Sequence, residues 1–135
     1  MTVVKVETMP VDSESQVVAV RQTVRSWAGE LGFSLVDQTK IVTAASELAR
    51  NILDHGGGEG FVHIETLTKG ERTGLQVVFE DKGPGIADLE LAMKDGYTSG
   101  GGLGLGLGGA KRLVNEFQVA TRPGEGTRVV IIRWK

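Results

Sequence analysis

Apolar residues recur every three or four positions in two long stretches of the chain, and this spacing predicts two amphipathic helices. The first begins at Ser13, whose spacing from Gln16 matches a capping box, and stops at Gly32. The second begins at Ser34, where Asp37 completes a second box, and closes at residues 55–58. The expected buried faces consist of Val17, Val20, Val24, Trp27 and Leu31 in the first helix and Ile41, Ala44, Ala45, Leu48 and Ile52 in the second.

Alternating and β-branched residues predict strands over 2–8, 61–67, 74–80, 117–122 and 127–134. Met9 and Pro10 should end the first strand, and the turn after residue 68 should join the second and third strands as a hairpin. Shorter helices are expected over 86–94 and 110–116.

Helices and strands are segregated along the chain, which favours an α+β fold over a strictly alternating one. We predict a single domain over 1–135: a two-layer α/β sandwich with a mixed, mostly antiparallel sheet and helices on one face. The first helix, with Trp27 among its apolar residues, could pack on this sheet or pair with another subunit, and we expect the former.

Composition narrows the class of protein. Lys and Arg number 15 against 17 Asp and Glu, and the net charge of −2 argues against a nucleic-acid binder that relies on bulk positive charge. The lack of cysteine excludes disulfides and thiolate zinc sites. The N-terminus lacks a signal-peptide core, and no apolar run approaches the roughly 18 residues of a membrane span. The expectation is a cytoplasmic protein without a membrane segment.

Glycine is concentrated in residues 81–86 and 96–109, and this density indicates a ligand site. Bare backbone N–H groups and helix N-termini both attract phosphate, so we expect the longer run to close over a nucleotide's phosphates. The run matches G-x-G-x-x-G, but no strand precedes it and too little chain follows for a βαβ unit. It also lacks the Gly-Lys-Ser/Thr of a P-loop, so both motifs are rejected.

Three polar side chains could serve such a site. Glu47 and Asn51 lie four residues apart at the margin of an apolar helix face, where their oxygen atoms could hold Mg²⁺ or its water. A solvent-wetted helix edge is the alternative. Asp81 could accept a hydrogen bond from an exocyclic amine such as that of adenine, while Gly83 and Gly85 let the ring lie against backbone. A strand-ending turn is the alternative there.

Taken together, these features resemble the motifs of the GHKL ATPases, which include the ATP-binding domains of gyrase, Hsp90, histidine kinases and MutL. The parts are Glu47 and Asn51 on a helix, a D-x-G-x-G turn over 81–85, a glycine-rich segment over 101–107 and Gly-Thr at 126–127. Each part alone is weak evidence for this family, but all four in this order over residues 46–127 form a specific signature. The stretches 36–38, 45–52, 80–86, 95–101 and 132–134 are similar to those of the small bacterial serine/threonine kinases of the anti-sigma and stress-switch group.

The resemblance implies an ATP site with a role for each matching residue. Asn51 would coordinate Mg²⁺, and Glu47 would act as the catalytic general base toward a substrate serine hydroxyl. Asp81 would receive the adenine amine, with Gly85 beneath the ring and Thr127 supporting Asp81 directly or through water. Gly102, Gly104 and Gly106 would offer N–H groups to phosphate. The implied cofactor-binding set is completed by Gly83, Ile86, Leu103, Leu105 and Leu107.

The implied function is that of a switch-type protein serine/threonine kinase. It would use Mg-ATP to phosphorylate a STAS-domain partner and, once released, would activate a metal-dependent serine phosphatase in a stress-response sigma-factor cascade. Two alternatives stay open. One is an anti-sigma factor that sequesters a sigma factor and phosphorylates its antagonist. The other is a nucleotide-gated binding module with little transfer activity.

One departure from the family pattern concerns charge. Kinases of this group commonly carry a basic residue near the γ-phosphate in the glycine-rich segment, but between Asp95 and Gly109 there is no Lys or Arg. Transition-state charge would then rest on Mg²⁺ and amides, or on a basic group of the partner. We therefore expect weak ATPase activity in the absence of the partner.

Overall fold

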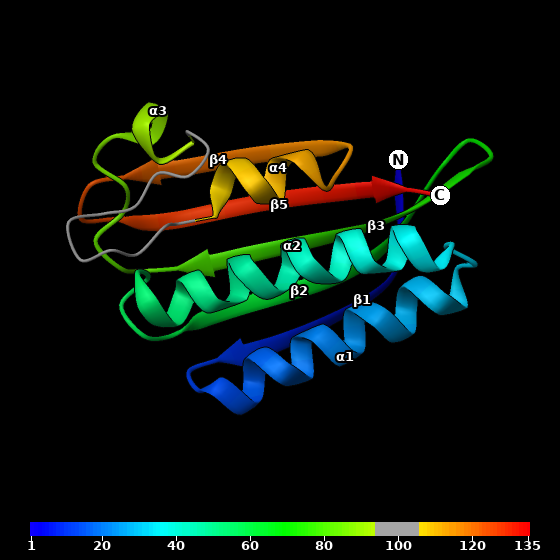
Figure 1. The fold of residues 1–135 in the computed structure, drawn as a ribbon, viewed down its shortest axis with the longest axis horizontal. Helices are drawn as coiled ribbons and strands as arrows, with labels where there is room; N and C mark the ends of the chain where they lie inside the picture. The colour runs from blue at the N-terminus through cyan, green and yellow to red at the C-terminus, as the bar shows by residue number, and fades with distance from the viewer. Residues whose placement is uncertain (94–105) are drawn as a thin grey trace.

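The computed structural model describes residues 1–93 and 106–135 as two layers, a sheet with helices packed on one face (Figure 1). The elements are β1 (Thr2–Val11), α1 (Glu14–Glu30), α2 (Leu35–Asp54), β2 (Gly60–Lys69), β3 (Arg72–Asp81), α3 (Leu89–Ala92), α4 (Leu107–Arg112), β4 (Glu116–Arg122) and β5 (Gly126–Trp134). The strands lie in the order β1-β2-β3-β5-β4, and every neighbouring pair is antiparallel. The predicted α+β fold with helices on one face is confirmed, and the sheet that we expected to be mixed is antiparallel at each described ladder.

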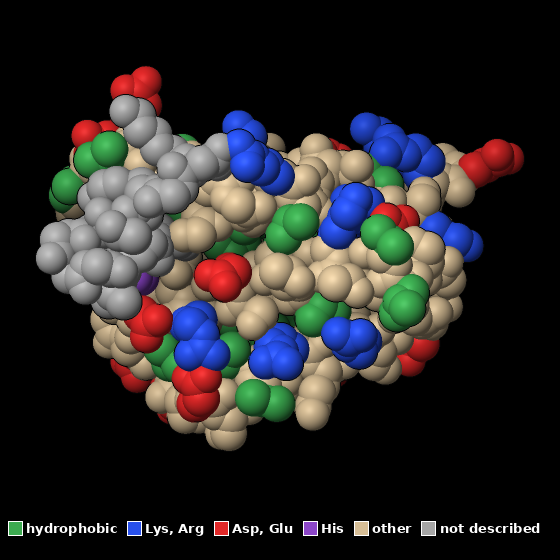
Figure 2. Space-filling view, viewed as in Figure 1, with side chains coloured by type: hydrophobic (Ala, Val, Ile, Leu, Met, Phe, Trp, Pro, Cys, Tyr) green, Lys and Arg blue, Asp and Glu red, His purple; other side chains and the backbone are tan. Residues whose placement is uncertain are grey.

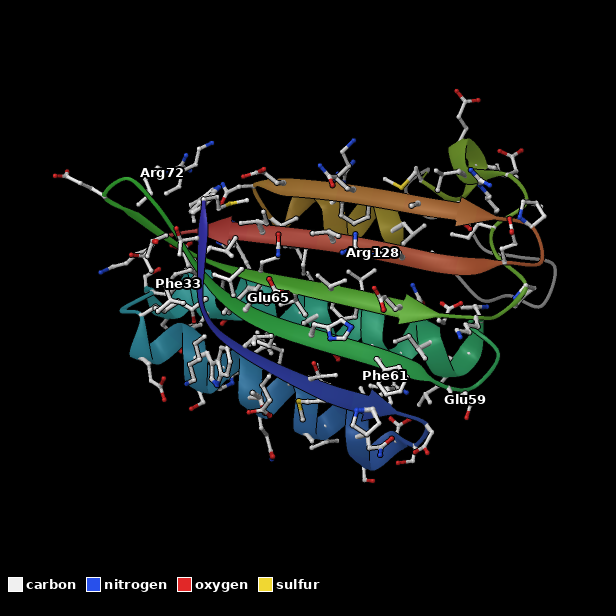
Figure 3. The ribbon with its side chains drawn as sticks, turned by 180° about the vertical axis from the view of Figure 1, so that it is seen from behind. Phe33, Glu59, Phe61, Glu65, Arg72 and Arg128 are labelled. Carbon is white, nitrogen blue, oxygen red and sulfur yellow. The ribbon has the colours of Figure 1, made fainter. Side chains whose placement is uncertain are left out.

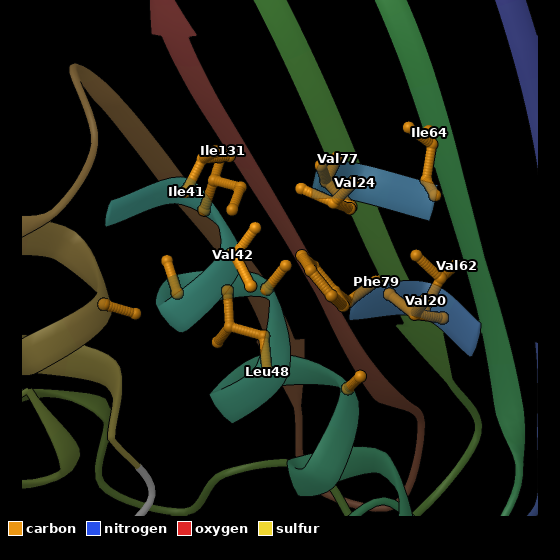
Figure 4. Close-up of a cluster of buried hydrophobic side chains, with 14 of the residues drawn as sticks. Val20, Val24, Ile41, Val42, Leu48, Val62, Ile64, Val77, Phe79 and Ile131 are labelled. Atoms are coloured by element: carbon orange, nitrogen blue, oxygen red, sulfur yellow. The ribbon is translucent and has the colours of Figure 1, made fainter. Parts of the chain in front are cut away.

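The core lies between the two long helices and the sheet (Figure 4). Both apolar faces predicted from periodicity are buried, except that Leu31 is half-buried at the end of α1. Trp27 packs inside this core with 5% of its surface exposed, and the Lys5 ammonium lies 4.0 Å from its ring centroid. The first helix therefore packs on the sheet, as we expected. The labelled side chains of Figure 4 come from both layers: Val20, Val24, Ile41, Val42, Leu48, Val62, Ile64, Val77, Phe79 and Ile131.

The two predicted capping boxes have different outcomes. Ser34 caps α2, because its hydroxyl accepts a hydrogen bond from the Asp37 N–H at 3.1 Å. Ser13 occupies the N-cap of α1, but its side chain makes no capping hydrogen bond, so the box predicted there is wrong. The Gln16 side chain accepts instead from the Asp12 N–H, one residue before the position that the box requires.

The first strand is longer than predicted. It continues through Pro10 to Val11 because β1 is the edge strand, where proline's missing N–H breaks no ladder on the open side. Three valines of this strand are exposed, and its register with β2 shifts between Val3 and Lys5. The two short helices also differ from prediction: α3 covers only residues 89–92, and α4 runs over 107–112, earlier than the expected 110–116.

The opposite face of the sheet is not covered by helices, and it carries Phe61, Glu65 and Arg128 (Figure 3). Its side chains form polar contacts across the strands, such as the Gln76 amide donating to the Glu65 carboxylate at 2.8 Å. Trp134 lies on this face with the Arg72 guanidinium 4.4 Å from its ring centroid. On the helix-covered face, basic and acidic side chains are interspersed over the described surface (Figure 2). Within residues 1–93 and 106–135, no helix is long and apolar enough to cross a membrane.

Candidate nucleotide site

A cavity of about 470 Å³ lies where the C-terminal half of α2 meets the end of β3 and the start of α4. This volume is within the usual range for small-molecule sites, about 300–1,000 Å³. Its floor is apolar and buried, and its rim is polar. Six residues that the sequence predicted for the nucleotide line it: Asn51, Asp81, Gly85, Ile86, Leu107 and Thr127.

Helix α2 places Asn51 in the wall of the cavity and Glu47 one turn earlier, outside the lining. Asn51 is half-buried, whereas Glu47 is exposed and does not line the cavity. A Cβ atom built on Gly106 would lie 2.9 Å from Glu47 Oε2, so the carboxylate faces the N-terminus of α4. The end of the helix is fixed because the Asn51 carbonyl accepts hydrogen bonds from the N–H groups of His55 and Gly56, at 2.8 and 2.9 Å.

Asp81 ends β3 and is held in place by backbone. Its Oδ1 accepts a hydrogen bond from the Gly83 N–H at 2.9 Å. A Cβ on Gly56 would lie 2.6 Å from Asp81 Oδ2, and a Cβ on Gly83 would lie 2.4 Å from the Gly56 carbonyl carbon. The loop after α2 and the turn after β3 therefore meet backbone to backbone. The sequence analysis missed Gly56, although the three consecutive glycines after α2 were a visible signal.

Thr121 on β4 is a second residue that sequence reasoning missed. Its hydroxyl accepts a hydrogen bond from the Ile86 N–H at 2.9 Å and donates one to the Gly126 carbonyl at 3.2 Å. The same hydroxyl lies 2.9 Å from the Thr127 hydroxyl. Thr127 pairs with Asp81 in the β3–β5 ladder, and its described side-chain hydrogen bond is to Thr121. The support of Asp81 by the Thr127 side chain stays a prediction. Only the β4–β5 register brings Thr121 here, and no motif marks it.

Gly85 lines the cavity, but its lack of a side chain has another physical reason as well. Its φ is +74°, and a Cβ there would lie 2.2 Å from the Arg122 carbonyl oxygen. This close approach alone requires glycine, whichever ligand the cavity takes. That Gly85 lies beneath an adenine ring stays a prediction. Gly83 is not part of the cavity lining, and its N–H supports Asp81 instead.

Only part of the predicted phosphate-binding segment falls within the described residues. Gly102, Leu103, Gly104 and Leu105 lie outside them. Gly106 is the N-cap of α4 with a φ of +66°, and Leu107, the first residue of that helix, is buried against the cavity. The helix begins earlier than predicted because Leu107 and Ala110 join the core and outweigh the low helix propensity of Gly108 and Gly109.

The charges around the cavity are acidic. Asp54, Asp81 and Asp88 line it, His55 stands beside them, and no Lys or Arg does so in the described part of the chain. Over the same residues there is no cluster of three His, Cys, Asp or Glu side chains able to hold a metal. The donor set therefore suits a hard cation that takes one protein oxygen and most of its ligands from phosphate and water. Asn51, whose amide oxygen is a hard ligand, fits this role.

A larger and more open hollow of about 940 Å³ lies at the same end of the sheet on the uncovered face. Phe61, Glu80 and Arg128 line it, and it shares Asp81 and Thr127 with the smaller cavity. Burial there opposes ionisation of Glu80, but hydrogen bonds from Arg128 (3.0 Å) and His63 (3.4 Å) prevail and lower the pKa of that carboxyl. This hollow lacks Asn51 and the start of α4, so the smaller cavity is the candidate nucleotide site.

Comparisons with known proteins identify the family of this chain. Residues 36–135 match the family described as histidine kinase-, DNA gyrase B- and HSP90-like ATPase. The chain is 48% identical to the serine/threonine-protein kinase RsbT of Bacillus subtilis over 90% of its own length and 91% of that protein. It is 33% identical to the anti-sigma F factor of Clostridium kluyveri, over 82% of this chain and 80% of the relative.

Solved structures show the same fold at lower identity. The chain superposes on the crystal structure of the RsbU and RsbW domains of Rv1364c from Mycobacterium tuberculosis with a TM-score of 0.60 and 22% identity. That match covers 98% of this chain and 33% of the solved one, so the chain spans about a third of it. The catalytic domain of histidine kinase ThkA gives a TM-score of 0.54 at 14% identity, over 94% of this chain and 95% of that domain.

The fold and these matches define an ATPase domain of the protein-kinase type. The chain belongs to the histidine kinase-, DNA gyrase B- and HSP90-like ATPase family and, within it, to the protein serine/threonine kinases related to RsbT and the anti-sigma F factors.

Proposed function

We propose that this kinase transfers the γ-phosphoryl group of Mg-ATP to a serine or threonine of a STAS-domain partner. The observation that carries the proposal is the arrangement along α2. Asn51 lies in the wall of a cavity that reaches Asp81. One turn earlier Glu47 is exposed, and its carboxylate faces Gly106, the residue before the cavity-lining Leu107. A nucleotide inside the cavity and a protein hydroxyl outside it can therefore meet at Glu47.

The transfer step uses Glu47 as the general base. The carboxylate accepts the proton of the acceptor hydroxyl while its oxygen forms a bond to the γ-phosphorus. The bond from that phosphorus to the β,γ-bridging oxygen breaks, and ADP leaves with the electron pair. Such a base contributes about 10²–10⁴-fold to the rate. Exposure of Glu47 suits a substrate that is itself a folded protein, because the acceptor must reach the carboxylate from solvent.

The adenine ring of ATP and the metal ion would bind at opposite ends of the cavity. Asp81 Oδ1 is already occupied by the Gly83 N–H, so Oδ2, beside Gly56, is the oxygen that would accept the adenine amine. The Asn51 side-chain oxygen would hold Mg²⁺, which neutralises phosphate charge when bound. The remaining N–H groups for phosphate would come from residues 102–106.

The biological output would be a partner switch in the cytoplasm, with the 135-residue chain acting as one kinase domain. Phosphorylation of the STAS partner would release the kinase, which then activates a metal-dependent serine phosphatase in a sigma-factor cascade. The 48% identity to RsbT supports this reading. The match to anti-sigma F factors supports a second candidate, a kinase that sequesters a sigma factor and phosphorylates its antagonist. Purification of the native complex distinguishes them, because a phosphatase accompanies the first and a sigma factor the second.

The first test is calorimetric titration of Mg-ATP into the wild type and Asp81→Asn. The asparagine side chain keeps the shape of aspartate, but its N–H₂ group can face the adenine amine, and two donors cannot form a hydrogen bond. We therefore expect the affinity for Mg-ATP to fall about 100-fold, which corresponds to the loss of one hydrogen bond to a charged group. Absence of binding to the folded wild type would refute the ATP site.

Transfer is tested separately with Glu47→Gln and a purified STAS-domain protein. We expect Mg-ATP binding to be retained and transfer to fall about 10²–10⁴-fold. Partner-free ATP hydrolysis by the wild type should be weak. Unchanged transfer in Glu47→Gln would show that Glu47 is not the base. If instead the wild type binds Mg-ATP but transfers nothing, the chain is a nucleotide-gated binding module.

A further inference from the structure

We infer that Arg50 is the basic residue that acts on the transferring phosphoryl group, and that Glu14 holds it in position. This inference rests on the kinase reaction proposed above. It replaces two earlier options for the missing charge, amides with Mg²⁺ alone or a basic group from the partner, with a residue of this chain.

The chemistry requires a positive charge near the γ-phosphate. Phosphoryl transfer spreads negative charge over the three equatorial oxygens, and an arginine that contacts them is worth about 10³–10⁵ in rate in enzymes that use one. Residues 95–109 contain no Lys or Arg, and no Lys or Arg lines the described part of the cavity. Lys111 and Arg112 lie in the last turn of α4, away from its N-terminus at Gly106.

Helix geometry places Arg50 beside Glu47. Arg50 follows Glu47 by three residues and Asn51 follows it by four, so at about 100° per residue the two side chains flank Glu47 on either side. Asn51 lies on the cavity side, and Arg50 lies on the side of α1. The Glu47 carboxylate and that of Asp54 both act on Arg50 electrostatically, after the larger effect of Glu14, and together they raise the pKa of the guanidinium. The guanidinium is therefore within electrostatic reach of the carboxylate that would take the acceptor's proton.

Glu14, in the first turn of α1, binds the Arg50 guanidinium through two hydrogen bonds. Arg50 Nη1 donates to Glu14 Oε2 at 3.0 Å, and Nη2 donates to Oε1 at 2.5 Å. A bidentate pair uses two of the five N–H donors of a guanidinium and fixes its plane, which leaves the others to contact a phosphoryl oxygen. The side chains of Arg50 and Glu14 are 40% and 61% exposed, so an incoming substrate can reach the pair.

Neighbouring residues therefore form a row that runs from α1 across α2 to the start of α4, in the order Glu14, Arg50, Glu47 and Gly106. Arg50 would donate hydrogen bonds to equatorial oxygens as they gain charge, while Glu47 takes the proton of the acceptor. Glu14 is a positioning residue, because it acts through Arg50 and touches no reacting atom.

The test measures kcat and KM for transfer from Mg-ATP to a STAS-domain protein that the wild type phosphorylates, together with ATP affinity by calorimetry. For Arg50→Ala we expect kcat to fall at least about 100-fold, with the KM for the protein and the ATP affinity within about threefold. Arg50→Lys should recover only part of the loss because an ammonium cannot form the bidentate pair. Glu14→Gln should lower kcat about tenfold through loss of the charge that holds Arg50.

Chemical rescue separates a reacting guanidinium from a structural one. Added methylguanidinium should raise kcat of Arg50→Ala and leave that of Glu47→Gln unchanged. Arg25→Ala, which removes an exposed arginine from the outer side of α1, is the matched control and should behave as wild type. A higher KM for the protein with unchanged kcat would overturn the inference by making Arg50 a docking contact.

Two further outcomes would also refute it. Loss of ATP binding in Arg50→Ala would assign the residue a structural role, and full activity in that variant would assign it none. If the wild type transfers no phosphoryl group to any STAS-domain protein, the proposed function itself fails. An active wild type with an unimpaired Arg50→Ala refutes only the role of Arg50.

Discussion

The two ends of α2 are built on different principles. At its start, polar groups are paired with one another: Ser34 caps the helix, and the Asp37 carboxylate accepts from Arg133 Nη2 at 2.6 Å. Arg133 Nη1 also donates to the Leu113 carbonyl at the end of α4, at 2.9 Å. At the other end, Asn51 lies in the wall of a cavity and the Glu47 carboxylate faces Gly106. The neighbouring turns pack through bare glycine backbone.

The difference separates stability from function along one helix. The start of α2 ties three elements together, whereas its end leaves room and polar groups for a ligand. A site of this kind needs a rigid supporting backbone, because a ligand is bound well only when the groups that contact it are held in place. Substitutions at the two ends should therefore change different measured quantities.

The largest expected effect is at the site end, in Asn51→Ala. The variant removes the amide oxygen proposed as the Mg²⁺ ligand, so we expect the affinity for Mg-ATP to fall about 100-fold and to lose its dependence on the metal. Calorimetric titration with and without EDTA measures both. Thr39→Ala, near the start of the same helix, is the control and should keep the metal dependence. If Asn51→Ala still responded to EDTA as the wild type does, Asn51 would not be the metal ligand.

The next effect compares two glycines with nearly equal backbone angles. Gly85 has a φ of +74° and Gly124 a φ of +79°, but only a Cβ on Gly85 would meet backbone, at 2.2 Å from the Arg122 carbonyl oxygen. Each Ala variant should pay about 1–2 kcal/mol for the left-handed conformation. Gly85→Ala should lose about 2 kcal/mol more in the free energy of unfolding, measured in urea, because the turns must separate. Equal losses would mean that the two turns yield to the added methyl group.

The smallest effect is at the start of α2, in Asp37→Asn. The hydrogen bond from Arg133 holds the pKa of Asp37 below its usual value of 3.8. A lowered pKa stabilises the folded state above the unfolded pKa, and this contribution disappears as the pH falls through the folded pKa. Asp37→Asn should thus be less stable than wild type at pH 7, with the difference shrinking below pH 3.8, and should bind Mg-ATP normally. Thermal unfolding across pH and one calorimetric titration check both statements, and a stability difference that does not change with pH would contradict the first.

Local patterns predicted the elements well where several signals agreed. Helix α2 was predicted from Ser34 to His55 because its cap, its apolar period and its closing glycines all agree. The first strand was predicted to stop at residue 8 because proline was read as a terminator, although an edge strand tolerates it. The start of α4 was misplaced because burial of Leu107 outweighs the propensity of the glycines that follow.

The site was predictable as a set of side chains but not as an assembly. Asn51, Asp81 and Thr127 were singled out from motif spacing, and they do line one cavity. Gly56 and Thr121 were missed because their importance comes from which turns meet in space, and the β4–β5 register decides that. The pairing of Glu14 with Arg50 joins residues 36 positions apart in sequence, so it also lies beyond local patterns.

The edge strand β1 has a consequence for solubility. The strand carries Val3, Val4 and Val6, which are 51%, 62% and 58% exposed, and an exposed apolar edge of this kind is a template for pairing with other chains. The register shift before Lys5, the charge of Lys5 and the missing N–H of Pro10 are the features that protect it. Lys5→Val would leave four valines in a row at this edge, and such a chain should aggregate on heating while its nucleotide site stays intact.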